Sequence, residues 1–148
     1  KMNALQDPAM IERLYEASQA GVKIDLIVRG ICCLIPGRKF SRNIRVTRIV
    51  DTFLEHARVW YFGNGGKPKL FLGSPDWMRR NLYRRIEAVT PILDPDLKRE
   101  LSDMLSIQLS DKRKACFVDD HLRNRWKSAR PQKEKIRSQY TFYEYLKN

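Results

Sequence analysis

Residues 53–87 read FLEHARVWYFGNGGKPKLFLGSPDWMRRNLYRRIE and contain the clearest structural signals in the chain. Within it, two short apolar runs at residues 59–62 and 70–72 are joined through Gly63-Asn64-Gly65-Gly66. Glycine and asparagine readily adopt the positive φ that a tight turn requires. The pattern therefore predicts a β-hairpin, around which the rest of the chain is organised.

Groups suited to phosphoryl chemistry surround this hairpin. His56, one of two histidines in the chain, precedes it, and Gly73-Ser74-Pro75-Asp76 follows it. Four arginines then come within seven residues, at positions 79, 80, 84 and 85. Imidazole attacks phosphorus or moves a proton near neutral pH, and guanidinium forks match phosphate oxygens. We interpret the stretch as a phosphate-handling site.

Three segments carry a resemblance to a known family. They are EHARVWYFGNGG (residues 55–66), GSPDWMRRNLYRRIE (residues 73–87) and the upstream ASQAGVKIDLIVRGICCLIPG (residues 17–37). Together they resemble the C-terminal part of bacterial polyphosphate kinase, over nearly the whole chain. More distantly, the pattern is similar to the His-x-Lys and Gly-Ser-x-Asn signature of phospholipase D-like enzymes. Arg58 then stands in the lysine place and Asp76 in the asparagine place.

The resemblance implies an activity and a set of site residues. The family transfers the γ-phosphate of ATP reversibly to polyphosphate, with Mg²⁺, through a phosphohistidine in the preceding domain. His56 is then the second active-site histidine, which binds phosphate or protonates a leaving oxygen. Arg29, in the VRGICCL motif, matches the family's ATP-phosphate-binding arginine, with Arg58, Arg80 and Arg85 as helpers.

From the residues alone, the arginine assignments stay open. Arg29 follows an apolar strand, where ligands gather in open α/β sheets, but a solvent-exposed arginine beside a turn glycine is the more ordinary interpretation. Arg80 and Arg84 share a face if a helix continues that far. If a strand has begun, Arg85 and Glu87 share one instead.

The chain departs from the family pattern at two places. Ser41-Arg42-Asn43 stands where we expect a slightly longer loop with Ser-Glu-Asn, which makes this loop more basic. Tyr83 stands where the family usually has an aspartate. An arginine that such an aspartate orients has lost its partner here or finds it elsewhere.

Composition limits the possible partners and compartments. The chain has 148 residues, is 43% hydrophobic and carries a formal net charge of +12, which indicates one globular domain with a polyanionic partner. Nucleic acid, polyphosphate, nucleotides and an acidic membrane all fit that charge. Three cysteines, two of them adjacent at Cys32 and Cys33, favour a reducing cytosol over a disulfide framework. A peripheral position on the inner membrane face is a further option, and no transmembrane segment or signal peptide is evident.

Helix signals stand on both sides of the central stretch. Asp7 and Pro8 predict a helix start, because aspartate caps a helix and proline suits its first turn, and Gly21 ends that helix. Asp94 and Pro95 repeat this signal before a second helix that reaches residue 108. We also predict a short helix over residues 49–55 that delivers His56 to its C-terminal end, a helical turn over 77–82 and a closing helix over 140–146.

Strands and loops fill the remainder. Strands are predicted at residues 22–28, 44–46, 57–62 and 85–92, with an edge strand at 115–118. Residues 119–138 are strongly charged, contain Pro131 and predict a loop. In that loop His121 is expected to be a surface residue, and we assign no metal ligands. Helices alternating with strands over short links predict an α/β layer fold.

Taken together, residues 1–148 are interpreted as one α/β domain, phospholipase D-like, with a mixed sheet flanked by helices. It is expected to be the C-terminal catalytic domain of a polyphosphate kinase, cut from a longer chain because it opens on Lys1. By itself it is expected to be inactive, with ATP, ADP and polyphosphate as ligands and Mg²⁺ bound mainly by the absent domains. Those preceding domains are its expected partners, in a homo-oligomeric full-length enzyme. The alternatives are a phospholipase D-like phosphodiesterase or nuclease half with His56 as nucleophile, and a non-catalytic polyanion-binding module.

Overall fold

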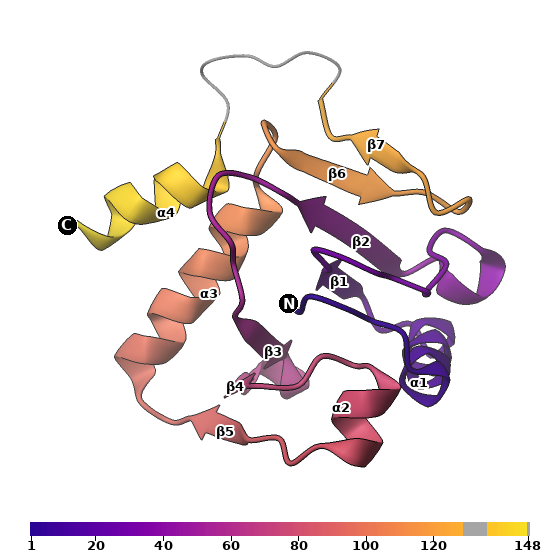
Figure 1. Ribbon diagram of the computed structural model, residues 1–148. Helices are drawn as coiled ribbons and strands as arrows, with labels where there is room; N and C mark the ends of the chain where they lie inside the picture. Colours follow the sequence, from indigo (N-terminus) through magenta and orange to yellow (C-terminus); the bar gives the residue numbers. More distant parts are fainter. Residues whose placement is uncertain (129–135, 148) are drawn as a thin grey trace.

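A layer of strands runs through the molecule, with helices on its two sides (Figure 1). The computed structural model describes residues 1–128 and 136–147. A four-stranded sheet has the order β1-β2-β6-β7, in which only β1 and β2 are parallel, and a three-stranded antiparallel sheet has the order β3-β4-β5. The elements are α1 (Pro8–Gln19), β1 (Ile24–Ile27), η1 (Lys39–Ser41), β2 (Ile44–Ile49), β3 (Arg58–Phe62), η2 (Asn64–Gly66), β4 (Lys69–Gly73), α2 (Arg79–Arg84), β5 (Val89–Ile92), α3 (Pro95–Leu109), β6 (Ala115–Val118), β7 (Asn124–Trp126) and α4 (Ser138–Leu146).

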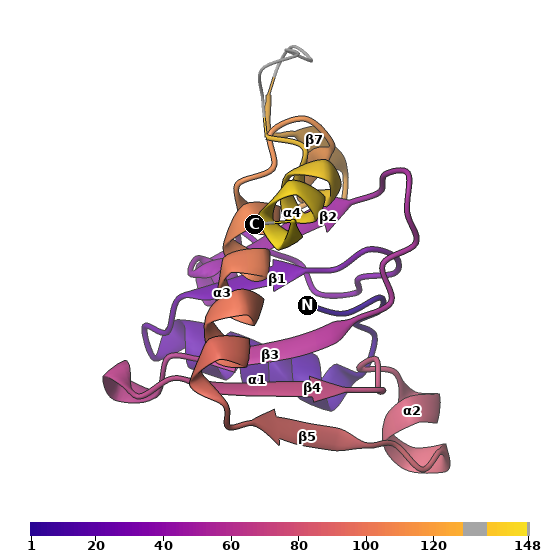
Figure 2. The same cartoon turned by 90° about the vertical axis from the view of Figure 1, so that its left-hand side faces the viewer.

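The first five residues join the two sheets. On one side, the Met2 N–H donates to the Ile27 carbonyl oxygen at 2.9 Å, next to β1. On the other side, the Val59 N–H of β3 donates to the Lys1 carbonyl oxygen at 3.0 Å. In two views the N-terminal segment lies between β1 and β3 (Figures 1 and 2). The strands therefore form a mixed layer flanked by helices, as the sequence predicted.

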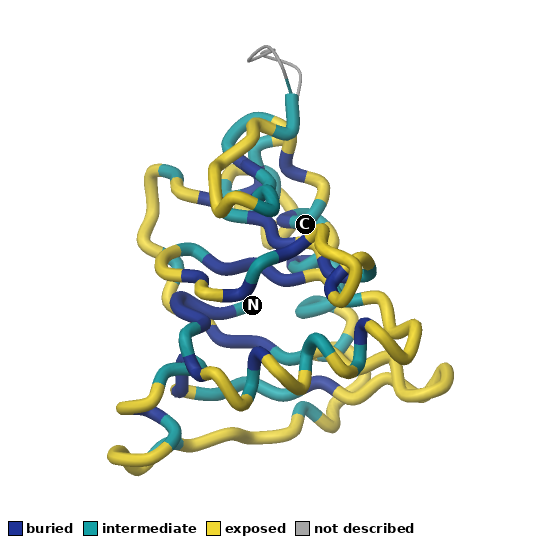
Figure 3. Tube along the Cα trace, turned by 90° about the vertical axis from the view of Figure 1, so that its right-hand side faces the viewer, coloured by how far each residue is buried: buried dark blue, intermediate teal, exposed yellow. Residues whose placement is uncertain are grey.

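The core lies on both faces of the four-stranded sheet. Alternate residues of β1 and β2, including Leu26 and Val46, pack on the α1 side. The opposite alternation brings Ile27 and Ile49 against α3. Burial is concentrated in these central strands, whereas β5 and the turn of the β3–β4 hairpin are largely exposed (Figure 3).

Local signals placed several elements correctly. The Asp7 carboxylate accepts from the Met10 N–H at 3.1 Å and caps α1, and the Asp94 carboxylate caps α3 in the same way. The predicted hairpin is β3–β4, with Val59 opposite Leu72. Its turn contains Asn64, Gly65 and Gly66, all at positive φ. The closing helix is α4.

Three other predictions were wrong. Residues 50–57 form no helix, because Ile49 ends β2 and the chain continues in irregular structure to β3. The strand at 115–118 is not an edge strand, because β7 pairs with it inside the predicted loop. The strand expected from residue 85 begins only at Val89. Pro131 lies outside the described residues.

No helix in residues 1–128 or 136–147 has the length and apolar character needed to cross a membrane.

Candidate functional site

The Asn3 side chain links Arg29 and His56. Arg29 Nε donates to Asn3 Oδ1 at 2.8 Å, and Asn3 Nδ2 lies 3.3 Å from His56 Nδ1. Arg29 comes two residues after β1 ends and His56 two residues before β3 begins. Because residues 1–5 lie between these strands, they bring together two side chains that are far apart in the sequence.

The Arg29 turn is held from two further directions. The Gly30 N–H donates to the Asn3 carbonyl oxygen at 2.8 Å, and a Cβ at position 30 would approach that oxygen to 3.0 Å, so glycine permits the close contact. Arg48, in β2, donates from Nη2 to the Gly30 carbonyl oxygen at 2.7 Å and from Nη1 to Asn124 Oδ1 at 2.9 Å. Strands β2 and β7 therefore support the turn that carries Arg29.

Arg58 lies in a buried ion pair with Asp76. Each of its three guanidinium nitrogens is engaged: Nε and Nη2 donate to the Asp76 carboxylate, and Nη1 donates to the His56 carbonyl oxygen at 2.9 Å. Asp76 Oδ1 also accepts from the backbone N–H groups of Asn3 at 2.7 Å and Ala4 at 3.1 Å. Burial by itself raises the pKa of Asp76, but these donors outweigh it and hold that pKa below its usual value. Arg58 thus supports the backbone at His56, and its fork is not presented to a ligand.

The arginine cluster after β4 lies on the surface. Because α2 extends to Arg84, Arg80 and Arg84 share an exposed helical face. Arg85 is exposed, and its Nε lies 3.7 Å from Glu87 Oε1. Within the described residues, no hydrogen bond joins Arg80 or Arg85 to Arg29 or His56.

Glu87 connects the Gly-Ser turn to α2. Its carboxylate accepts from the Ser74 hydroxyl and from Asn81 Nδ2, and these two hydrogen bonds lower the pKa of Glu87. Tyr83, which replaces an expected aspartate, is exposed. Tyr83 thus offers Arg85 no carboxylate, and among the described residues Glu87 is the acidic side chain paired with Arg85.

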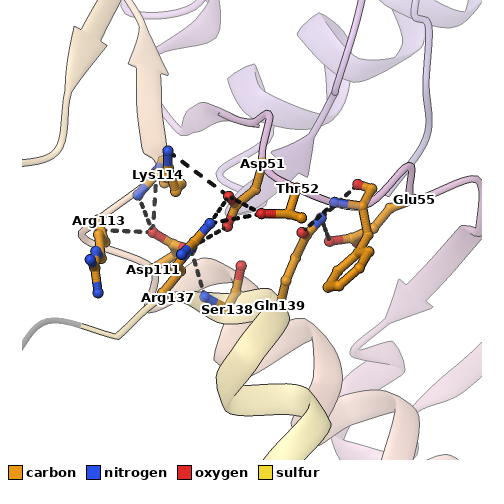
Figure 4. A network of polar contacts seen from close by, with 11 residues as sticks. Asp51, Thr52, Glu55, Asp111, Arg113, Lys114, Arg137, Ser138 and Gln139 are labelled. Carbon is orange, nitrogen blue, oxygen red and sulfur yellow. Dashed lines mark hydrogen bonds and ion pairs between the residues drawn. The ribbon is translucent and has the colours of Figure 1, made fainter.

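The segment before His56 is held by the start of α4 (Figure 4). Arg137 donates from Nε and Nη2 to the Asp51 carboxylate at 2.8 and 2.6 Å, which lowers the pKa of Asp51. Gln139 accepts from the Phe53 N–H through Oε1 and donates to the Phe53 carbonyl oxygen through Nε2, both at 2.8 Å. Because Gln139 takes both backbone groups of Phe53, they are not available for the predicted helix.

Asp111 anchors that end of α4. Its carboxylate is fully buried and accepts from the Ser138 N–H at 2.7 Å and from three N–H groups of its own turn, those of Arg113, Lys114 and Ala115. The sequence signal was an aspartate just past a helix end, typical of a side-chain-capped turn. Asn3 and Gln139 carried no comparable signal, because their partners are far away in the sequence.

A cavity of about 240 Å³ lies beside His56, between the 53–57 segment, α3 and α4. Its polar lining includes Glu55, which accepts from Gln108 and Gln139. Ligand pockets usually measure about 300–1,000 Å³, so this cavity is too small to enclose a nucleotide.

The remaining sequence assignments concern His121 and metals. His121 is an exposed residue with Nε2 3.8 Å from Asp120 Oδ1, so its surface position is confirmed. Over residues 1–128 and 136–147, no group of three His, Cys, Asp or Glu side chains is arranged to hold a metal ion.

Comparisons with known proteins cover the whole site. A family model described as "Polyphosphate kinase C-terminal domain 2" matches residues 1–139. The chain is 58% identical over 116 residues to the polyphosphate kinase of Synechocystis sp., covering 78% of this chain and 16% of that protein. It is 47% identical over 149 residues to the polyphosphate kinase of Escherichia coli, covering 100% of this chain and 22% of that protein.

A solved structure of a polyphosphate kinase also matches the fold. The crystal structure of polyphosphate kinase from Porphyromonas gingivalis matches with a TM-score of 0.94 and 57% identity, over 99% of this chain and 22% of that chain. The chain therefore spans about a fifth of the length of these relatives.

Proposed function

The chain belongs to the family of polyphosphate kinase C-terminal domains, and from this premise we propose that it is part of an enzyme that transfers the γ-phosphate of ATP reversibly to polyphosphate. The observation that carries the proposal is the meeting of Arg29 and His56 at Asn3. A guanidinium and an imidazole held side by side suit the binding of phosphoryl oxygens.

In this proposal Arg29 binds the nucleotide phosphates. Its Nε is held by Asn3, and Nη1 and Nη2 have no protein partner among the described residues. The two unpaired NH₂ groups of a fixed guanidinium suit two phosphate oxygens, and positive charge there stabilises the charge that builds up during transfer. Arg80 and Arg85 add exposed positive charge as helpers, and Arg58 has a positioning role through the His56 carbonyl.

His56 is proposed to contact the transferred or leaving phosphate. Its side chain is exposed, and its backbone is held by Arg58. Phosphoryl transfer depends mainly on positioning and charge stabilisation, so Arg29 and His56 together form one side of a transfer site.

Mg²⁺ is the metal that the family implies. The residues that the structure describes do not fit a magnesium site of their own: they hold no group of three His, Cys, Asp or Glu side chains suited to a metal ion, and Asp76, the carboxylate bonded to Asn3, is committed to Arg58. We propose that the ion is held by the nucleotide phosphates and by residues of the longer relatives outside this chain.

The proposal extends to partners and location. Preceding domains of the same enzyme would supply the phosphohistidine and the rest of the phosphate clamp, in a homo-oligomeric full-length enzyme. The three cysteines are all unpaired, which supports a cytoplasmic location, with peripheral membrane association as a further option. The relatives that match this chain are polyphosphate kinases, which favours this function over a phosphodiesterase half or a polyanion-binding module.

The decisive experiment uses the full-length enzyme. Arg29→Ala should lower ATP-dependent polyphosphate synthesis by about 10²–10³-fold, as removal of one transition-state donor does. Arg29→Lys should rescue only part of that loss, because a point charge does not replace a fork. Arg13→Ala, which removes an exposed arginine paired with Glu16 on α1, is the matched control. Full activity of Arg29→Ala would remove Arg29 from the site.

The chain by itself should be inactive. Incubated with γ-labelled ATP and Mg²⁺, it should form neither acid-labile protein phosphate nor polyphosphate, because residues that act as a unit lose nearly all activity when separated. It should still bind tripolyphosphate weakly, with an affinity that falls steeply with salt. Stoichiometric labelling of His56 would overturn its supporting role and favour the phospholipase D-like alternative.

A further inference from the structure

The orientation of the Asn3 amide is fixed by its partners. A guanidinium only donates hydrogen bonds, so the atom of Asn3 that faces Arg29 Nε at 2.8 Å must be the oxygen. The nitrogen Nδ2 therefore faces His56 Nδ1, at 3.3 Å. The Asn3 backbone is held independently, by Asp76 through its N–H and by Gly30 through its carbonyl, and the residue is only 8% exposed.

This orientation dictates which imidazole nitrogen carries the proton. An amide nitrogen has hydrogens to donate and no lone pair to accept with, so His56 Nδ1 must be the acceptor. A neutral imidazole with Nδ1 as acceptor has its proton on Nε2. We propose that Asn3 holds His56 in the tautomer with the proton on Nε2, so that His56 acts as a donor to a phosphate oxygen and not as a nucleophile.

The surrounding carboxylates point to the same tautomer. A histidine nucleophile attacks through a nitrogen lone pair, and a carboxylate on the opposite nitrogen favours the tautomer that frees it. Among the described residues, none of the acidic side chains bonds to His56: Glu55 is bonded by Gln108 and Gln139, and Asp76 by Arg58. The lone pair of Nδ1 faces Asn3, and Nε2 carries the proton.

The role of His56 toward phosphate rests on the proposed function, whereas the tautomer does not. A neutral Nε2–H donates a hydrogen bond to a phosphate oxygen. It does not give that proton to a leaving oxygen, because the ring would be left as an imidazolate and Asn3 has no proton to return to Nδ1. Asn3 is then a positioning residue, because it acts on the ligand only through Arg29 and His56. The amide of Asn3 thus orients the Arg29 guanidinium through its oxygen and sets the tautomer of His56 through its nitrogen.

Nitrogen-15 NMR of the imidazole rings tests the tautomer directly. The chain has two histidines, and His121 is an exposed surface residue that serves as an internal reference. Long-range proton–nitrogen correlations are recorded at about pH 8.5, well above the ordinary imidazole pKa of about 6.5. His121→Gln assigns the signals. His56 should show the pattern of a proton on Nε2, and a proton on Nδ1 would overturn the proposal.

Substitution of Asn3 gives the second arm. Asn3→Asp keeps an oxygen for Arg29 but removes the donor to His56, so His56 should change to the tautomer with the proton on Nδ1. The matched control is Asn64→Asp, an exposed asparagine in the β3–β4 turn whose side chain bonds only to the Lys67 carbonyl oxygen among the described residues, and it should leave the His56 pattern unchanged. An unchanged pattern in a folded Asn3→Asp would refute the role of Asn3. If that variant does not fold, the wild-type spectrum still decides the tautomer.

A binding measurement separates this inference from the proposed function. Asn3→Asp should weaken tripolyphosphate binding to the chain by about tenfold or more, as loss of a hydrogen bond to a charged group does. Asn64→Asp supplies the correction for the added negative charge. A wild-type chain with the Nε2 proton but no tripolyphosphate binding would contradict the phosphate role and leave the tautomer standing. Tripolyphosphate binding by a wild-type chain that carries the proton on Nδ1 would refute the tautomer and leave the phosphate role standing.

Discussion

Arg58 and Asp76 form a two-pronged ion pair inside the protein, with Nη2 2.9 Å from Oδ2 and Nε 3.2 Å from Oδ1. Their side chains are only 10% and 7% exposed. The pair joins the start of β3 to the segment after β4. Its remaining hydrogen bonds hold the backbones of His56, Asn3 and Ala4. The residue that stands in the lysine place of a phospholipase D-like signature is therefore part of the framework behind the site.

Removing the arginine of this pair should destabilise the fold strongly. Arg58→Gln should lower the free energy of unfolding by about 3–5 kcal/mol, because it leaves the Asp76 carboxylate buried without its charged partner. Urea unfolding of the chain measures the loss. Arg85→Gln, which removes an exposed arginine 3.7 Å from Glu87, should change stability by no more than about 0.5 kcal/mol. Equal stability of the two variants would show that the buried pair contributes nothing.

The same carboxylate should make the protein sensitive to acid. Burial raises the pKa of Asp76, but the hydrogen bonds from Arg58, Asn3 and Ala4 bring it below the usual value. A lowered pKa in the folded state means that the unfolded chain takes up the proton first, at about pH 4. The stabilisation is complete above that pH and is lost as the pH falls through the folded pKa. Unfolding measured from about pH 6 to pH 2 should show a shallower decline for Asp76→Asn than for the wild type. Parallel curves would contradict this assignment.

Two glycines of the β3–β4 hairpin, one in its turn and one at the end of β4, should respond oppositely to alanine. A Cβ at Gly73 would lie 2.7 Å from Trp60 Cζ3 and 2.9 Å from the Ala88 carbonyl oxygen, so Gly73→Ala should cost about 1–3 kcal/mol or more. Gly63 has open space around its Cβ position and a φ of −64°. Gly63→Ala should be neutral or stabilising by up to about 1 kcal/mol. Thermal unfolding of both variants checks this, and a harmless Gly73→Ala would mean that β4 and β5 shift apart easily.

The contact between Gln139 and Phe53 predicts a local effect. Gln139→Ala removes two hydrogen bonds to the Phe53 backbone, so the segment before His56 should open more often. Each hydrogen bond contributes about 1 kcal/mol, so exchange of the Phe53 amide should accelerate by about fivefold or more. Hydrogen exchange followed by NMR measures the rate. Gln19→Ala, on the exposed side of α1, should leave the Phe53 rate unchanged, and an unchanged rate in Gln139→Ala would show that other contacts hold the segment.

Much of the fold followed from signals that lie within a few residues of one another. The Asp7-Pro8 and Asp94-Pro95 pairs marked the starts of α1 and α3, since capping depends on a side chain and an N–H two or three positions away. The Gly65 and Gly66 turn marked the hairpin, because positive φ is a property of single residues. The predicted helix at residues 49–55 failed for the opposite reason: its apolar spacing was helical, but the backbone of Phe53 is bonded to Gln139.

Residue types at fixed short spacings were enough to indicate the family, the hairpin and the candidate residues Arg29 and His56. The contacts that these residues make depend instead on the packing of segments that are far apart in the chain. Asn3 became the link between Arg29 and His56 because residues 1–5 lie between two strands that begin and end far along the chain. The guanidinium of Arg58 pairs within the protein, because Asp76, 18 residues away, is buried beside it and accepts hydrogen bonds from its Nε and Nη2. An arginine side chain presents its guanidinium to a ligand only where no buried carboxylate already pairs with it. Whether such a partner is present depends on the packing of distant segments, which residue spacing does not encode.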